Sequence, residues 1–101
     1  MFLIRSIAQT QAGRRNEAVS ISKEFAAEMR QASGASSSRI LTGSIGPADS
    51  TIVIESEVES LAQFEKQLDA MNNSPSMERY AKKFAELFIS GSHRFEIFRI
   101  Q

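Results

Sequence analysis

The stretch that decides the fold is residues 51–100, TIVIESEVESLAQFEKQLDAMNNSPSMERYAKKFAELFISGSHRFEIFRI. It opens with Thr51–Val58, a run rich in β-branched residues that predicts a strand. Amphipathic helical sequence follows, and Arg94–Ile100 predicts a closing strand. Residues 2–44 repeat the same strand–helix–strand plan. Two such halves predict an α+β, ferredoxin-like fold of β-α-β-β-α-β order, in which one four-stranded antiparallel sheet carries the helices on one face.

The first half supplies two of the four expected strands, Phe2–Gln9 and Arg39–Ile45. Between them, apolar residues recur at steps of three and four, which is the spacing of one helix face. Gly34 is a natural residue to follow the last helical turn. A turn at residues 46–49 separates Arg39–Ile45 from Thr51–Val58, so these two strands are expected to form a hairpin. The helical stripe consists of Ala18, Ile21, Phe25, Met29 and Ala32.

The second half predicts two helical segments. Ser60 and Gln63 have the spacing of a capping box, so a helix is expected to begin after Ser60. Residues 72–75 interrupt the pattern, and Ser74 followed by Pro75 predicts the N-cap and first residue of another helix. The apolar stripes are Leu61, Phe64, Leu68 and Met71 in the first segment, then Met77, Tyr80, Ala81, Phe84, Leu87 and Phe88 in the second.

Composition narrows the class of protein. The 101 residues suit one domain over residues 1–101. Lys and Arg number 12, as do Asp and Glu, and this balance argues against a nucleic-acid partner. There is no cysteine to form a disulfide or a thiolate metal site. The start of the chain is charged too early for a signal sequence, and no apolar run is long enough to cross a membrane, so we expect a cytoplasmic protein without a membrane partner.

The strands carry one apolar side and one mixed side, and this alternation predicts a homodimer. Ile52 and Ile54 point one way, while Val53 and Glu55 point the other. We expect the apolar side to face the helices, which leaves the mixed side bare. Apolar residues on that bare side would be exposed in a monomer, and such a patch usually marks an interface. Packing two bare faces together would form a β-sandwich or a barrel between two subunits. The residues expected to be exposed are Leu3, Ile7 and Val53.

Several local segments make the chain resemble the dimeric α+β barrel superfamily, and NIPSNAP-like proteins in particular. The resemblance covers nearly the whole chain. It implies the fold and the dimer more specifically than a function, because this superfamily includes cofactor-free monooxygenases, heme enzymes, isomerases and many uncharacterised members. The segments that carry it are residues 3–5 (LIR), Gly13, 57–61 (EVESL), 73–76 (NSPS), 83–87 (KFAEL), 90–91 (SG) and 94–100 (RFEIFRI).

Three charged residues, Arg5, Glu55 and Arg99, are expected near the barrel interior and are candidate ligand-binding residues. An internal arginine can hold a carboxylate or phenolate by a charge-assisted fork. The alternative, which we favour, is an Arg5–Glu55 pair that satisfies only itself. Which side of the last strand faces inward stays open, because charged and apolar residues alternate along it.

Two further candidates for ligand binding are His93 and Tyr80. The lone His93 could act as a general base or as a heme ligand, although its place at the start of the last strand favours a solvated position. The absence of tryptophan counts against heme degradation of the kind found in similar enzymes, and a single histidine excludes a two-histidine metal site within one chain. Tyr80 could donate a proton, but it lies on a helical stripe and is expected to be a core residue. No cofactor or metal is expected.

Two classes of function remain open from the sequence. The first is a NIPSNAP-like dimeric α/β barrel protein that binds a small hydrophobic or aromatic metabolite in the barrel interior. The second is a cofactor-independent monooxygenase or isomerase of the antibiotic-biosynthesis monooxygenase type, in which Arg5 would stabilise an anionic intermediate in a water-excluding site. No residue pattern demands catalysis, so the first class is preferred.

Overall fold

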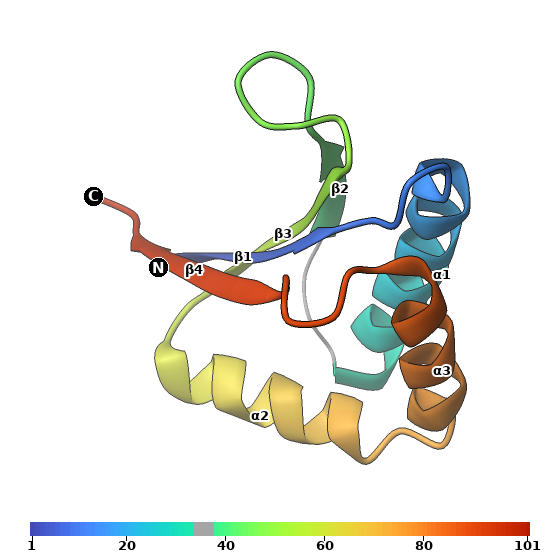
Figure 1. The fold of residues 1–101 in the computed structure, drawn as a ribbon. Helices are drawn as coiled ribbons and strands as arrows, with labels where there is room; N and C mark the ends of the chain where they lie inside the picture. The colour runs from blue at the N-terminus through green and yellow to red at the C-terminus, as the bar shows by residue number, and fades with distance from the viewer. Residues whose placement is uncertain (34–37) are drawn as a thin grey trace.

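The structure is a computed structural model that describes residues 1–33 and 38–101. It contains four strands and three helices, in the β-α-β-β-α-β order that the sequence predicts, with the second helical part divided in two (Figure 1). The elements in chain order are β1 (Phe2–Gln9), α1 (Arg15–Ser33), β2 (Ser38–Thr42), β3 (Thr51–Val58), α2 (Leu61–Asn72), α3 (Met77–Leu87) and β4 (Arg94–Arg99).

The four strands form one antiparallel sheet in the order β2-β3-β1-β4, which is the ferredoxin-like arrangement. Consecutive strands β2 and β3 pair as the expected hairpin. The helices lie on one side of the sheet, and no helix of the described residues covers the other side (Figure 1). The predicted α+β class and the single layer of helices are therefore confirmed.

The start of β2 and the end of β4 each differ from the prediction by one residue, and two further boundaries differ by more. Strand β2 ends at Thr42 instead of Ile45, because the chain turns sharply at Gly43: a Cβ atom there would lie 1.7 Å from the carbonyl oxygen of Ala48. Helix α3 begins at Met77 with Ser76 as its N-cap. The predicted N-cap Ser74 instead accepts a backbone hydrogen bond from Met77 at 3.1 Å, within the turn that precedes the helix.

The other helix ends are close to expectation. Ser60 caps α2, and its Oγ accepts from the backbone N–H of Gln63 at 3.1 Å. Helix α1 begins at Arg15, one turn before the apolar stripe, and Glu17 in its first turn forms an ion pair (3.0 Å) with Arg14, which precedes the helix. The Ala32 side chain and Gly34 lie outside the described part of the chain.

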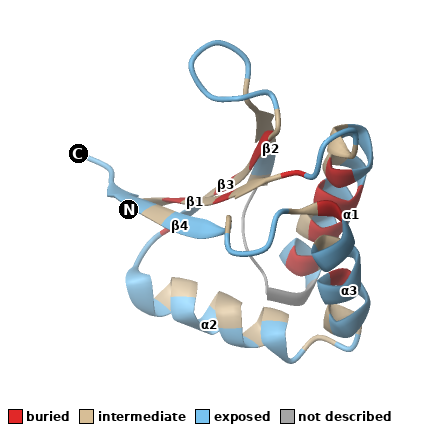
Figure 2. Ribbon diagram, in the orientation of Figure 1, coloured by how far each residue is buried: buried red, intermediate tan, exposed pale blue. Residues whose placement is uncertain are grey.

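The core lies where α1 and α3 pack against β3. Phe25 contacts Tyr80 and Phe84 edge to face, each with ring centroids 5.1 Å apart. Buried residues are concentrated on α1, α3 and the strands, whereas α2 has none (Figure 2). Among the described residues, the core cluster is Ala18, Ile21, Phe25, Met29, Ile52, Tyr80 and Leu87. Because α2 contributes no buried residue, it stands off the sheet instead of closing against it.

The bare sheet face only partly matches the prediction. Leu3 and Val53 are half-buried, but Ile7, which was expected to be exposed, is buried. Its place in the central strand β1, between partners Val53 and Arg94 on the two neighbouring strands, explains this burial. The exposed apolar residues of this face lie instead on the edge strand and just after it, at Phe98 and Ile100.

Candidate functional site

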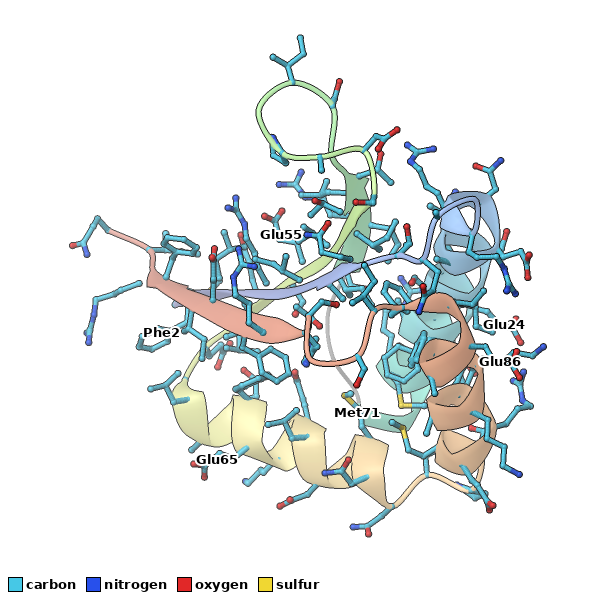
Figure 3. All side chains as sticks on the ribbon, in the orientation of Figure 1. Phe2, Glu24, Glu55, Glu65, Met71 and Glu86 are labelled. Atoms are coloured by element: carbon cyan, nitrogen blue, oxygen red, sulfur yellow. The ribbon has the colours of Figure 1, made fainter. Side chains whose placement is uncertain are left out.

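A cavity of about 710 Å³ lies between the helix-facing side of the sheet and the three helices. Its floor includes Ile4, Ile52 and Ile54, and its roof is formed by apolar side chains of the helices. Figure 3 shows Met71 at the end of α2 that adjoins this space. The size suits a small organic ligand, since such sites usually occupy several hundred Å³ and are mainly apolar. The roof residues include Phe25, Met29, Phe64, Leu68, Met71, Met77, Phe84 and Phe88.

The position of α2 explains why this space exists. Small side chains on the floor, Ser6 and Ala8 in β1 and Ser56 in β3, fill little of the gap beneath the helices. Phe64 of α2 meets Phe95 of β4 edge to face at 5.4 Å, which supports the helix at one edge of the sheet. The cavity is therefore a consequence of small residues on the floor and large residues at the rim.

Two of the polar residues on the cavity wall, one in β1 and one just before β4, contact each other. Ser6 Oγ and His93 Nε2 are hydrogen-bonded at 2.7 Å, and both residues line the cavity. The His93 ring also contacts the Phe95 ring edge to face at 4.8 Å. Because Ser6 and Phe95 are register partners, the sheet places the histidine, the serine and the phenylalanine together. The predicted solvated strand end is thus also part of the cavity wall.

The predicted pair of Arg5 and Glu55 forms on the opposite, bare face of the sheet. Arg5 Nε lies 2.9 Å from Glu55 Oε1, and Arg39 of β2 binds the other carboxylate oxygen. The Glu55 side chain is 2% exposed, whereas those of Arg5 and Arg39 are 38% and 71% exposed. Figure 3 shows Glu55 on the side of the sheet away from α2. Neither Arg5 nor Glu55 lines the cavity.

The electrostatics of this cluster agree with a self-satisfying arrangement. Burial raises the pKa of the Glu55 carboxyl, but the hydrogen bonds from Arg5 and Arg39 act against burial and together hold the pKa below its ordinary range. The Arg5 guanidinium also lies 5.3 Å from the centre of the Phe98 ring. A carboxylate that is already held by two arginines supports the structural interpretation of the pair over a role in ligand binding.

Tyr80 is fully buried and lies outside the cavity wall. Its hydroxyl donates to Glu28, which also accepts from Ser76 Oγ at 2.5 Å. Burial, followed by the bond to Glu28, raises the pKa of Tyr80, while the bonds from Ser76 and Tyr80 lower the pKa of Glu28. The Arg79 guanidinium covers the ring at 4.4 Å. Tyr80 is accordingly a core residue whose hydroxyl reaches the rim, as the helical stripe predicts.

Arg99 does not join Arg5 and Glu55. The register places it opposite Phe2, on the helix-facing side of the sheet, with its guanidinium 5.2 Å from the Phe2 ring centre. On β4 it is therefore Arg94 and Glu96 that share the bare face, where they form an ion pair at 3.1 Å. This register resolves the orientation of the last strand that the sequence left open.

Sequence reasoning missed the cavity residues on the sheet floor and on α2. Small residues at alternate positions of β1, Ser6 and Ala8, were the available signal, because a strand that packs tightly against helices usually carries larger side chains there. In the described part of the chain, no group of three or more His, Asp or Glu side chains is placed to hold a metal ion. Nor does any helix within the described residues have the length and apolar character that a membrane span requires.

Comparison with solved structures identifies proteins of the same fold. A NIPSNAP family protein from Agrobacterium tumefaciens matches with a TM-score of 0.81 and 14% identity, over 99% of this chain and 92% of that one. An uncharacterised NIPSNAP-like domain protein from Burkholderia xenovorans gives 0.81 and 13%, over 99% and 84%. A candidate antibiotic biosynthesis monooxygenase from Deinococcus radiodurans gives 0.73 and 11%, over 100% and 93%. The predicted resemblance to NIPSNAP-like proteins is thus confirmed at the level of the fold.

Comparisons of the sequence with known families and proteins find no match. No family model matches the chain, and no curated protein matches it.

Proposed function

We propose that this protein binds a small, mainly apolar molecule in the cavity between the helices and the sheet. The observation that carries the proposal is the cavity itself: its volume is about 710 Å³, its large lining side chains are chiefly Phe, Ile, Leu and Met, and its polar lining groups are chiefly small serines. The site differs from the barrel interior expected from the sequence, because the charges on the bare face satisfy one another and the space lies on the other side of the sheet.

Binding of the neutral fluorescent dye Nile red tests this proposal. The wild-type protein should bind one equivalent with increased, blue-shifted emission. Leu68→Trp places a larger side chain at the cavity wall and should weaken binding at least tenfold, whereas Leu61→Trp, at an exposed position of the same helix outside the cavity wall, should leave it unchanged. Equal binding by both variants and the wild type would place the dye elsewhere and contradict the proposal.

We also propose that two copies associate through their bare sheet faces. Phe98 and Ile100 are 47% and 43% exposed there, and half-buried Leu3 and Val53 extend the apolar surface toward the sheet centre. Exposed apolar surface of this kind is usually covered by a partner. Sedimentation equilibrium should give twice the chain mass at micromolar concentration, and a monomer mass would contradict this arrangement. A cytoplasmic location stays a prediction from the sequence.

A cofactor-independent monooxygenase or isomerase is the second candidate function, and one observation favours it. The hydrogen-bonded His93 and Ser6 lie on the wall of an apolar cavity, where an imidazole could accept a proton from a bound substrate. Arg5 lies on the bare face, where the sequence predicts it, and binds Glu55 there, so it does not reach a substrate in this cavity. Oxygen uptake with hydroxylated aromatic compounds, lost in His93→Gln while dye binding persists, would support this function; no uptake or product with any of them would count against it.

A further inference from the structure

The charge on the cavity wall is of one sign. Among the described residues that line the cavity, Arg30 is the only one with a full charge at neutral pH, and no Asp or Glu is present. Arg30 lies in the last turn of α1, and within residues 1–33 and 38–101 it has no ion-pair partner. A ligand with a single negative charge can therefore place that charge at Arg30 and meet no carboxylate on the wall.

The polar groups on the floor of the cavity lie toward two distant parts of the sheet. His93 precedes β4 at one edge of the sheet, while Ser38 begins β2 at the other edge, beside Ser56. Across the sheet, His93 and Ser38 are separated by three inter-strand spacings of about 4.8 Å each, and along the strands by four residues that rise about 3.4 Å each. The distance between them is therefore about 20 Å along the diagonal. The surface between is apolar, with Ile4 and Ile54 at its centre. The cavity is thus long as well as apolar.

We propose that the cavity accepts an elongated monocarboxylate of the fatty-acid type, with its chain over Ile4 and Ile54 and its carboxylate at Arg30. This inference rests on the function proposed above and specifies the class of ligand. One arginine balances the single charge of one carboxylate, whereas a phosphate ester carries more negative charge than this one cation can balance. A cationic amphiphile of the same length would meet repulsion from Arg30 and find no acidic partner in the wall.

Three ligands with the same chain and different head groups test the proposal: dodecanoate, dodecanol and dodecylammonium, each measured by displacement of Nile red below its micelle concentration. Dodecanoate should bind about fivefold more tightly than dodecanol, which is the most that an ion pair with an exposed arginine provides. Dodecylammonium should bind most weakly. Raising the salt concentration should reduce the advantage of dodecanoate.

Variants assign that preference to one residue. Arg30→Gln should remove the advantage of dodecanoate over dodecanol and leave dodecanol binding unchanged. Lys23→Gln is the matched control, because Lys23 is also an exposed cation of α1 but does not line this cavity. The control should retain the full preference.

The alternative outcomes separate this inference from the function on which it rests. If the three ligands displace the dye equally well, the cavity binds apolar molecules without a preference for a carboxylate head group. In that case only the inference is wrong. If the preference survives in Arg30→Gln, the assignment to Arg30 is wrong. If neither the dye nor any of the ligands binds, both the proposed function and the inference are overturned.

Discussion

Removing the arginines that hold Glu55 should show how a buried carboxylate depends on two partners. The perturbations are Arg5→Met, Arg39→Met and the double variant, with unfolding followed in urea at pH 7 and at one protein concentration. Each arginine binds a different oxygen of a side chain that is only 2% exposed. After either single change, one charged partner therefore remains to compensate the buried carboxylate.

The magnitudes follow from the exposure of the partners. Arg5→Met should cost about 1.5 kcal/mol, the lower end for hydrogen bonds to charged groups, because Arg5 is 38% exposed and water weakens the interaction. Arg39→Met should cost about 0.5 kcal/mol, since Arg39 is 71% exposed. The double variant leaves a buried charge without a partner and should cost about 3–5 kcal/mol, more than the two single losses together.

The pH dependence provides an independent check. Because the pKa of Glu55 is lowered in the folded protein, its ionisation stabilises the fold above the unfolded-state pKa, and this contribution is lost as the pH falls through the folded-state value. The cost of the double variant should therefore shrink at acidic pH. If the three variants lose almost no free energy of unfolding, and if the losses are additive and independent of pH, then water solvates Glu55. That result would refute the reasoning.

Four further predictions concern the core, the hairpin loop, the Tyr80 contact and heme. Phe25→Ala should cost about 3–5 kcal/mol in urea unfolding, because a buried ring with two edge-to-face contacts is lost. Gly43→Ala should cost about 3 kcal/mol and lower the thermal midpoint, since the new Cβ would lie 1.7 Å from a backbone carbonyl oxygen. Tyr80→Phe removes one of the hydrogen bonds that lower the pKa of Glu28, so the variant should be less stable at pH 7, and the difference should vanish as acid protonates that carboxyl. Titration with hemin should give no sharp Soret band at one equivalent that depends on His93; a band abolished by His93→Ala would contradict this expectation.

The sequence predicts those features that depend on local periodicity. Strands Phe2–Gln9 and Thr51–Val58 have the bounds that were expected, because alternation and β-branched residues define a strand along its whole length. The Ser60 cap is likewise confirmed, since a capping box needs only residues close in sequence. The end of β2 depends instead on how near Gly43 comes to Ala48 in space, and no local sequence pattern indicates that distance.

The candidate site could be predicted from the sequence only in part. The Arg5–Glu55 pair could be predicted, because both residues lie mid-strand on strands that the fold makes neighbours. Arg39 as the second partner was missed, since its position depends on the register of β2. The cavity could not be derived from the helical stripes, because periodicity identifies which face of α2 is inward but not how far that face stands from the sheet.

The loop between β2 and β3 offers a fixed external reference point on this molecule. Its base is held to the body by Arg15, which donates to the Asp49 carbonyl and to Thr42 Oγ1, both at 2.9 Å, while Ile45 projects with 95% of its surface in solvent. Because the chain has no cysteine, Ile45→Cys would introduce a single thiol at an exposed position of this loop. A spin label attached there would allow a distance measurement. In a pair of molecules joined through their sheets, the distance between the two labels would depend on how one copy is rotated against the other.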